Sequence, residues 1–247
     1  MSIINLISLI AGPAIAIFLA IRFRGKLNSQ DPTILIVSLL IGMICVVPSL
    51  VIKHTAAELG FDDSVRSLFG KIGYGTFTAF VDEFNKYIVI IAFAYRKKEF
   101  DEPLAGILVA IMVSMGFMMA DNAWHVMDID NDDRYTNTWR MLTSIPVNIA
   151  FAIVVGFYSG LSKYGMDSDD LSSFSLRIRG LATATFFHAF YNFLLFMEEY
   201  QSLTILIFLS AAILLVQIGL NLMRAFRLHT RLMYSRKKRS KSGTLEL

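Results

Sequence analysis

Five side chains of this sequence are of types that can carry out acid–base chemistry, and each lies within or at the edge of an apolar segment. Asp82 and Glu83 are adjacent, and Lys86 follows at a spacing that lets a helix bring its ammonium to either carboxylate. Asp121 and His188 come from two other segments. A carboxylate with an imidazole in reach can take a proton from water, which is the chemistry of a hydrolase.

Three asparagines, Asn122, Asn148 and Asn192, add hydrogen-bonding groups to the same set of segments. His188 and Asn192 are four residues apart, so a helix places both on one face. Asn148 and Asn192 are candidates to donate to a developing oxyanion, and interhelical hydrogen bonding explains Asn148 equally well. The amides therefore extend the predicted site to a fourth segment.

Ionised groups in a bilayer each cost roughly 2.5–3.5 kcal/mol on insertion scales, so a helix that keeps three of them is expected to use them. We predict that Glu83 is the general base that activates water and that Asp82 tunes it. Lys86 would keep one acid charged, and His188 would polarise a scissile carbonyl or ligate a metal. The structural alternatives are an ion pair that fixes helix packing and a core histidine bonded to a backbone carbonyl.

The segments that must position these residues are hydrophobic enough to cross a membrane. Of the 247 residues, 55% are hydrophobic and 17% are charged, whereas soluble domains average about 25% charged residues. We predict an all-α polytopic membrane protein with about seven transmembrane helices in one domain over residues 1–225. The predicted spans are 3–21, 33–52, 74–95, 103–124, 142–161, 179–197 and 203–224.

The distribution of basic residues predicts the orientation. With the N-terminus outside, 17 of the 23 lysines and arginines fall on the inside and five on the outside, and Lys86 lies in the membrane. The C-terminus is then cytoplasmic, and residues 226–247 form a basic tail that contacts an anionic inner leaflet. No aromatic platform accompanies these charges, so nucleic acid is not an expected partner. In this topology the buried polar groups all lie within roughly 15 Å of the outer surface, which predicts one polar chamber open to water from outside.

The order of these polar residues resembles that of the PrsW-type intramembrane proteases, over about residues 70–196. The family's paired-acid motif Glu-Glu-x-x-Lys is similar to Asp82-Glu83-Phe84-Asn85-Lys86. Its Gly-Phe followed by Glu-Asn resembles Gly116-Phe117-Met118-Met119-Ala120-Asp121-Asn122. Its His-x-x-x-Asp/Asn motif matches His188 and Asn192.

A further family motif has a proline, then a histidine, then two spaced glycines. Pro146, Gly156 and Gly160 fit it, but Asn148 stands where the family has histidine. A zinc site needs three protein ligands and usually includes two histidines or cysteines, and one histidine remains in this core. We therefore favour a glutamate mechanism that requires no cofactor, with a divalent metal such as zinc as the alternative.

Two further departures concern the acids, because Asp82 and Asp121 are each one methylene shorter than the family's glutamates. Together with Asn148, they raise the alternative of an altered or inactive relative. The family is distantly similar to the CAAX prenyl-protein peptidases, whose paired acids are followed by an arginine where this chain has Tyr87. That position favours the PrsW type.

The resemblance implies an endopeptidase that cleaves single-span membrane proteins, typically anti-sigma factors, near the outer face of a bacterial inner membrane. Such cleavage belongs to regulated proteolysis in stress signalling. One alternative is a catalytically inactive relative that binds membrane-protein clients. Another is a proton- or cation-coupled transporter that uses the buried acids as a relay, but transporters often show repeated halves with midplane sites, and neither feature is predicted here.

Overall fold

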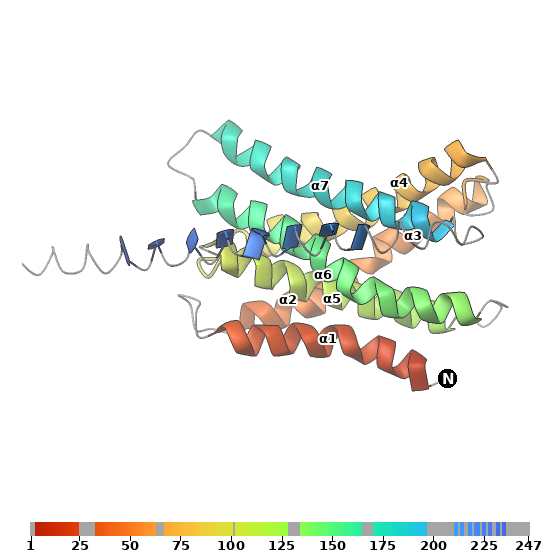
Figure 1. The fold of residues 1–247 in the computed structure, drawn as a ribbon, viewed down its shortest axis with the longest axis horizontal. Helices are drawn as coiled ribbons and strands as arrows, with labels where there is room; N and C mark the ends of the chain where they lie inside the picture. Colours follow the sequence, from red (N-terminus) through yellow and green to blue (C-terminus); the bar gives the residue numbers. More distant parts are fainter. Residues whose placement is uncertain are drawn as a thin grey trace, which may run out of the picture.

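The computed structural model describes residues 3–24, 33–62, 67–100, 102–127, 134–164 and 170–196, together with separate helical positions between 210 and 235. Within these residues every regular element is helical, which confirms the predicted fold class (Figure 1). The elements are α1 (Ile3–Arg24), α2 (Thr33–Ile44), α3 (Val46–Glu58), α4 (Leu68–Val89), the π-helical turn η1 (Ile90–Ala94), α5 (Pro103–Met127), α6 (Arg134–Tyr164) and α7 (Asp170–Phe196).

Three helical stretches of the described part are long and apolar enough to cross a membrane, namely Thr33–Glu58, Pro103–Val126 and Ser144–Lys163. The first consists of α2 and α3, which are joined through Cys45 with its backbone still in the right-handed helical region (φ −72°, ψ −5°). The structure thus has the helices of a membrane protein. The count of seven spans and the orientation of the two termini stay predictions.

Three helices begin well before the predicted spans with which they overlap: α4 at Leu68, α6 at Arg134 and α7 at Asp170. An apolar run marks only the part of a helix that suits hydrocarbon, whereas the helix itself continues until its backbone is capped. At the start of α4, for example, Ser67 Oγ accepts a hydrogen bond from the Gly70 N–H at 3.0 Å. The seventh predicted span is described only in part, and its described positions are helical.

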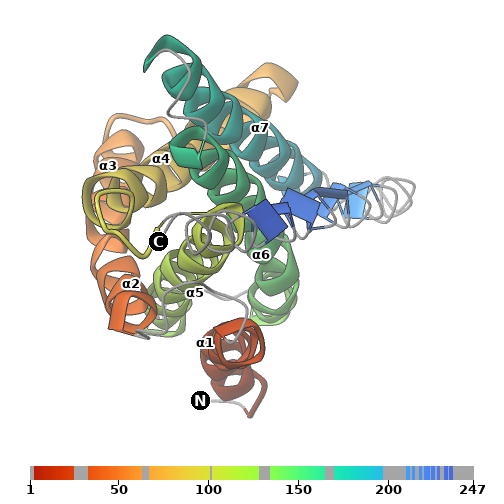
Figure 2. The ribbon, with the colours of Figure 1, turned by 90° about the vertical axis from the view of Figure 1, so that its left-hand side faces the viewer.

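Helix α5 lies at the centre of the bundle, with α1, α2 and α6 packed around it (Figure 2). Helix α7 packs against α6 and against α4, the helix that carries Asp82, Glu83 and Lys86. All side chains from Glu102 to Met118 are buried, as expected for a helix enclosed by others. Helices α1, α2 and α6 are therefore placed relative to α5.

Glycines allow the backbones around α5 to approach closely, as is common between membrane helices. A Cβ added to Gly106 of α5 would lie 2.4 Å from the Gly156 carbonyl oxygen and 3.1 Å from the Gly160 Cα, both on α6. On the side that faces α2, a Cβ on Gly116 would lie 2.0 Å from the Leu39 carbonyl oxygen. These glycines set the distances from α5 to its two neighbours.

The α5–α6 contact should not tolerate even one added methyl group. Gly156→Ala would push its Cβ to 2.4 Å from the Gly106 carbonyl oxygen, and overpacking of this kind costs about 1–3 kcal/mol. We expect a lower thermal unfolding midpoint of the purified protein in detergent. The matched control is Gly73→Ala, whose Cβ would meet only Phe61 Cζ at 3.9 Å and should leave the midpoint unchanged or higher. Equal midpoints for Gly156→Ala and the native protein would contradict this account.

Candidate active site

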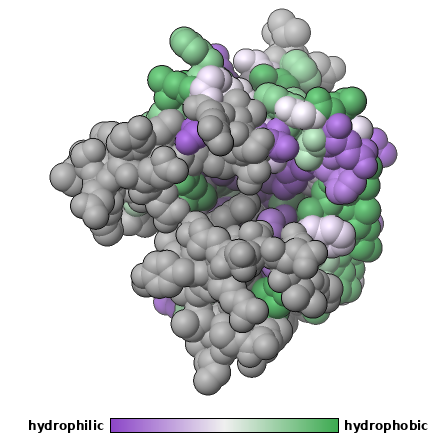
Figure 3. Space-filling model, turned by 90° about the vertical axis from the view of Figure 1, so that its right-hand side faces the viewer, coloured by the Kyte–Doolittle hydropathy of each residue, from purple (hydrophilic) through white to green (hydrophobic). Residues whose placement is uncertain are grey.

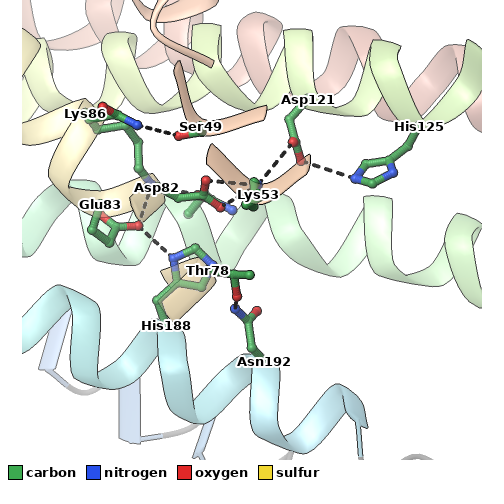
Figure 4. Close-up of polar contacts among 12 residues, drawn as sticks. Ser49, Lys53, Thr78, Asp82, Glu83, Lys86, Asp121, His125, His188 and Asn192 are labelled. Atoms are coloured by element: carbon green, nitrogen blue, oxygen red, sulfur yellow. Dashed lines mark hydrogen bonds and ion pairs between the residues drawn. The ribbon is translucent and has the colours of Figure 1, made fainter. Parts of the chain in front are cut away.

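The acid–imidazole centre consists of Glu83, Lys86 and His188, and it joins α4 to α7 (Figure 4). Lys86 Nζ contacts Glu83 Oε1 from the next turn of α4. His188 Nδ1 lies 2.9 Å from the same oxygen, although the two residues are 105 positions apart in the sequence. The Glu83 side chain is only 2% exposed, so its charge is compensated by these two groups and hardly by bulk water.

A hydrogen-bonded chain from α6 holds Lys86 in place. Lys86 Nζ donates to Asn148 Oδ1 at 3.1 Å, and Asn148 Nδ2 donates to the Ser144 carbonyl oxygen at 3.0 Å. From α5, Ser114 Oγ donates to the Asn148 carbonyl oxygen at 3.3 Å. The structure therefore places Asn148 beside the acid–imidazole centre, with its amide already engaged by Lys86 and the α6 backbone.

His188 has one further contact of its own, and its neighbour Asn192 on α7 has two. Phe151 of α6 stacks on the imidazole, with ring centroids 4.9 Å apart and an interplanar angle of 21°. One turn along α7, Asn192 Nδ2 donates to Thr78 Oγ1 at 3.1 Å and to the Gly75 carbonyl oxygen at 3.3 Å. Asn192 thus ties α7 to α4, and its amide donates to Thr78 and Gly75 and not to Glu83.

Asp82 belongs to a second group, the Lys53 cluster, which consists of Lys53, Asp82, Asp121 and His125 (Figure 4). Lys53 Nζ of α3 lies 3.0 Å and 3.2 Å from the two carboxylate oxygens of Asp82. The same ammonium is 3.9 Å from Asp121 Oδ1, and Asp121 Oδ2 is 3.7 Å from His125 Nε2. The sequence predicted that Lys86 can reach either acid and keeps one of them charged; in the structure Lys86 contacts Glu83, and Asp82 contacts Lys53 instead.

The two groups differ in their access to solvent. Lys53 and Asp121 side chains are each 18% exposed, in contrast to 4% for Lys86. Figure 3 views the molecule from the end where α3 finishes and α4 starts, and hydrophilic surface gathers there around a hollow. Asn122, the neighbour of Asp121 on α5, is buried. The Lys53 cluster therefore lies nearer to water, and the acid–imidazole centre lies deeper.

Sequence reasoning missed Lys53, because the predicted span ended at residue 52 and the lysine was assigned to an outside loop. Helix α3 instead continues to Glu58, so Lys53 is a helical residue that faces α4 and α5. The signal in the sequence was Ser49, a polar residue one turn earlier in the same apolar run. In the structure Ser49 is fully buried and accepts a hydrogen bond from Asn85 Nδ2 at 2.8 Å. Ser49 and Lys53 are four residues apart and form one polar stripe on α3.

The donor set that the described residues offer does not fit a resident zinc ion. Zinc takes at least three protein ligands, and no three His, Cys, Asp or Glu side chains of the described residues gather in a way that could hold one. Glu83 and His188 are one pair of potential ligands, but the third group at Glu83 is the Lys86 ammonium, which has no lone pair to offer.

Comparison with known proteins identifies the family of this chain. Residues 30–218, which include α2 to α7, match the model of a family described as PrsW family intramembrane metalloprotease. The Protease PrsW of Geobacillus kaustophilus is 26% identical to this chain, over 79% of this chain and 81% of the relative. The Protease PrsW of Shouchella clausii is also 26% identical, over 78% of this chain and 84% of the relative. The Protease PrsW of Bacillus subtilis is 21% identical over 74% of this chain and 79% of its own. No solved structure matches the chain significantly. The chain belongs to the PrsW family of intramembrane proteases.

Proposed function

We propose that this protease hydrolyses single-span membrane proteins near the outer face of the membrane, with Glu83 as the base that activates water. The observation that carries the proposal is the 2.9 Å contact between Glu83 Oε1 and His188 Nδ1 in a buried site. Lys86 contacts the same oxygen. Because both partners are on Oε1, Oε2 is the oxygen assigned to receive a proton from water.

The proposed reaction uses the two edges of the His188 ring. Nδ1 faces Glu83, so an imidazolium at this position presents the Nε2 N–H to the carbonyl oxygen of the scissile peptide. Glu83 takes one proton from water, and the hydroxide forms a bond to the carbonyl carbon. The bond from carbon to nitrogen then breaks as Glu83 returns the proton to the leaving amine. The immediate products are a carboxylic acid and an amine, and transfer of the acid's proton to the amine then gives a carboxylate and an ammonium.

The asparagines support this centre by position. The sequence predicted that Asn192 helps to polarise the carbonyl, but its amide donates to Thr78 and Gly75, and we assign it the task of holding His188 against α4. Asn148 is assigned to Lys86, which it fixes at 3.1 Å. Phe151 covers one face of the imidazole and limits rotation of the ring away from Glu83.

We further propose that the reaction needs no resident metal, although the family description makes a metal the obvious alternative. The support is the Lys86 ammonium, which contacts the Glu83 oxygen that a metal would otherwise share with His188.

We assign the protein to a bacterial cell membrane, with anti-sigma-factor-like substrates and an anionic inner leaflet at its basic tail. The bacterial relatives and the positive charge of residues 226–247 support this assignment.

Replacement of the base should slow cleavage severely. Glu83→Gln should slow cleavage of a tagged panel of single-span membrane proteins by roughly 10²–10⁴-fold, because an amide cannot accept the proton of water. Glu58→Gln is the matched control, since the Glu58 side chain is 67% exposed on α3 and should be dispensable. Native cleavage by Glu83→Gln would remove Glu83 as the base. If the unmutated protein cleaves no member of the panel, the inactive-relative hypothesis replaces this one.

Removal of metals tests the second part of the proposal. After dialysis of the purified protein against 1,10-phenanthroline and EDTA, we expect an unchanged cleavage rate, because the described donor set does not hold three metal ligands. Metal content measured on the same sample confirms that the treatment was complete. A loss of cleavage that added zinc restores would overturn the metal-free mechanism.

A further inference from the structure

The paired acids compete in principle for one lysine. Lys86 is three residues after Glu83 and four residues after Asp82, and both spacings allow an ion pair on a helix. In the structure Lys86 contacts Glu83, while Asp82 contacts Lys53. The backbone of α4 does not by itself decide between these pairings, so a group outside α4 must decide.

We propose that Lys53 is a positioning residue that, by holding Asp82, reserves Lys86 for Glu83. The Lys53 ammonium lies 3.0 Å and 3.2 Å from the two oxygens of Asp82, so it engages the whole carboxylate. It approaches from α3, on a different side of α4 from the one that faces His188 (Figure 4). Asp82 is thereby turned away from the acid–imidazole centre.

Loss of Lys53 would leave Asp82 and Asp121 close together without the ammonium between them. A poorly solvated carboxylate recruits a cation within reach, and Lys86 lies one turn along the same helix from Asp82. Lys86 would then leave Glu83 and Asn148. The base would lose the ammonium that keeps it ionised, and the proposed water activation would fail.

A purely structural ion pair makes a different prediction. If Lys53 and Asp82 only fasten α3 to α4, removal of either partner should do similar harm. If Lys53 assigns Lys86 to Glu83, Lys53→Met should be far more harmful to cleavage than Asp82→Asn. After Asp82→Asn, Lys53 still has Asp121 at 3.9 Å and Lys86 still has Glu83. The effect on cleavage rests on the proposed function, but the change of partner does not.

The change of partner can be measured without any substrate. Thermal unfolding midpoints in detergent are compared for Lys86→Met, Asp82→Asn and their combination, once with Lys53 present and once in a Lys53→Met background. When Lys53 is present, we expect the changes in midpoint from Lys86→Met and Asp82→Asn to be nearly additive. When Lys53 is absent, we expect clear non-additivity, because Lys86 and Asp82 pair only in the Lys53→Met background. Equal coupling in the two backgrounds would overturn the inference.

Cleavage of the tagged panel supplies the second readout. Lys53→Met should lower kcat by about tenfold or more with little change in KM, Lys53→Arg should retain cleavage, and Lys53→Met/Asp82→Asn should recover it. The exposed Lys98 provides the control Lys98→Met, which should cleave at the native rate. Native cleavage by Lys53→Met, or a double variant as slow as Lys53→Met, would overturn the inference.

Two safeguards keep the experiment decisive. If Lys53→Met does not fold, Lys53→Met/Asp121→Asn replaces it, because with His125 neutral that variant has the same net charge as the native Lys53 cluster. Its expected outcomes are the same. Coupling without cleavage by the unmutated protein supports the pairing and contradicts the proposed function. Cleavage by the unmutated protein without coupling contradicts the inference alone.

Discussion

The structure depends on how one deeply buried carboxylate is kept charged. Glu83 is 2% exposed, and a charge in such a place is tolerated only with a close partner of opposite charge and further hydrogen bonds. Lys86 supplies the first and His188 supplies a second contact at 2.9 Å. Because His188 comes from α7 and the amide that holds Lys86 comes from α6, the position of Glu83 determines which helices must lie beside α4.

Close packing around α5 makes that arrangement possible. Gly156 lets α6 approach α5 to backbone contact, and the same helix carries Asn148 and Phe151 on its earlier turns. If α6 stood further out, the amide and the phenyl ring would no longer reach Lys86 and His188. The glycines thus affect the active site only by setting the distance between α5 and α6. This explains how residues without functional groups form part of the motif that resembles the family's.

The sequence predicted the convergence of Glu83 and His188 well, because ionisable residues in apolar segments are rare and costly and so few combinations are open. The helical spacing of Lys86 gave its two candidate partners but not the choice between them. That choice depends on Lys53, a residue just beyond an apolar run, and only the actual end of α3 at Glu58 shows that it faces inward. The roles of Asn148 and Asn192 were equally out of reach, since the direction of an amide follows from tertiary contacts.

The central claim is that Glu83 and His188 act as one hydrogen-bonded unit. Nitrogen-15 NMR of the histidine-labelled protein in lipid bilayers tests it directly, since the shift of Nδ1 reports its hydrogen-bond partner. We expect a resonance assigned to His188 with a strongly hydrogen-bonded, protonated Nδ1 that moves when Glu83 is replaced by glutamine. A His188 resonance indifferent to that replacement would show that the two side chains do not meet, and the account would be wrong.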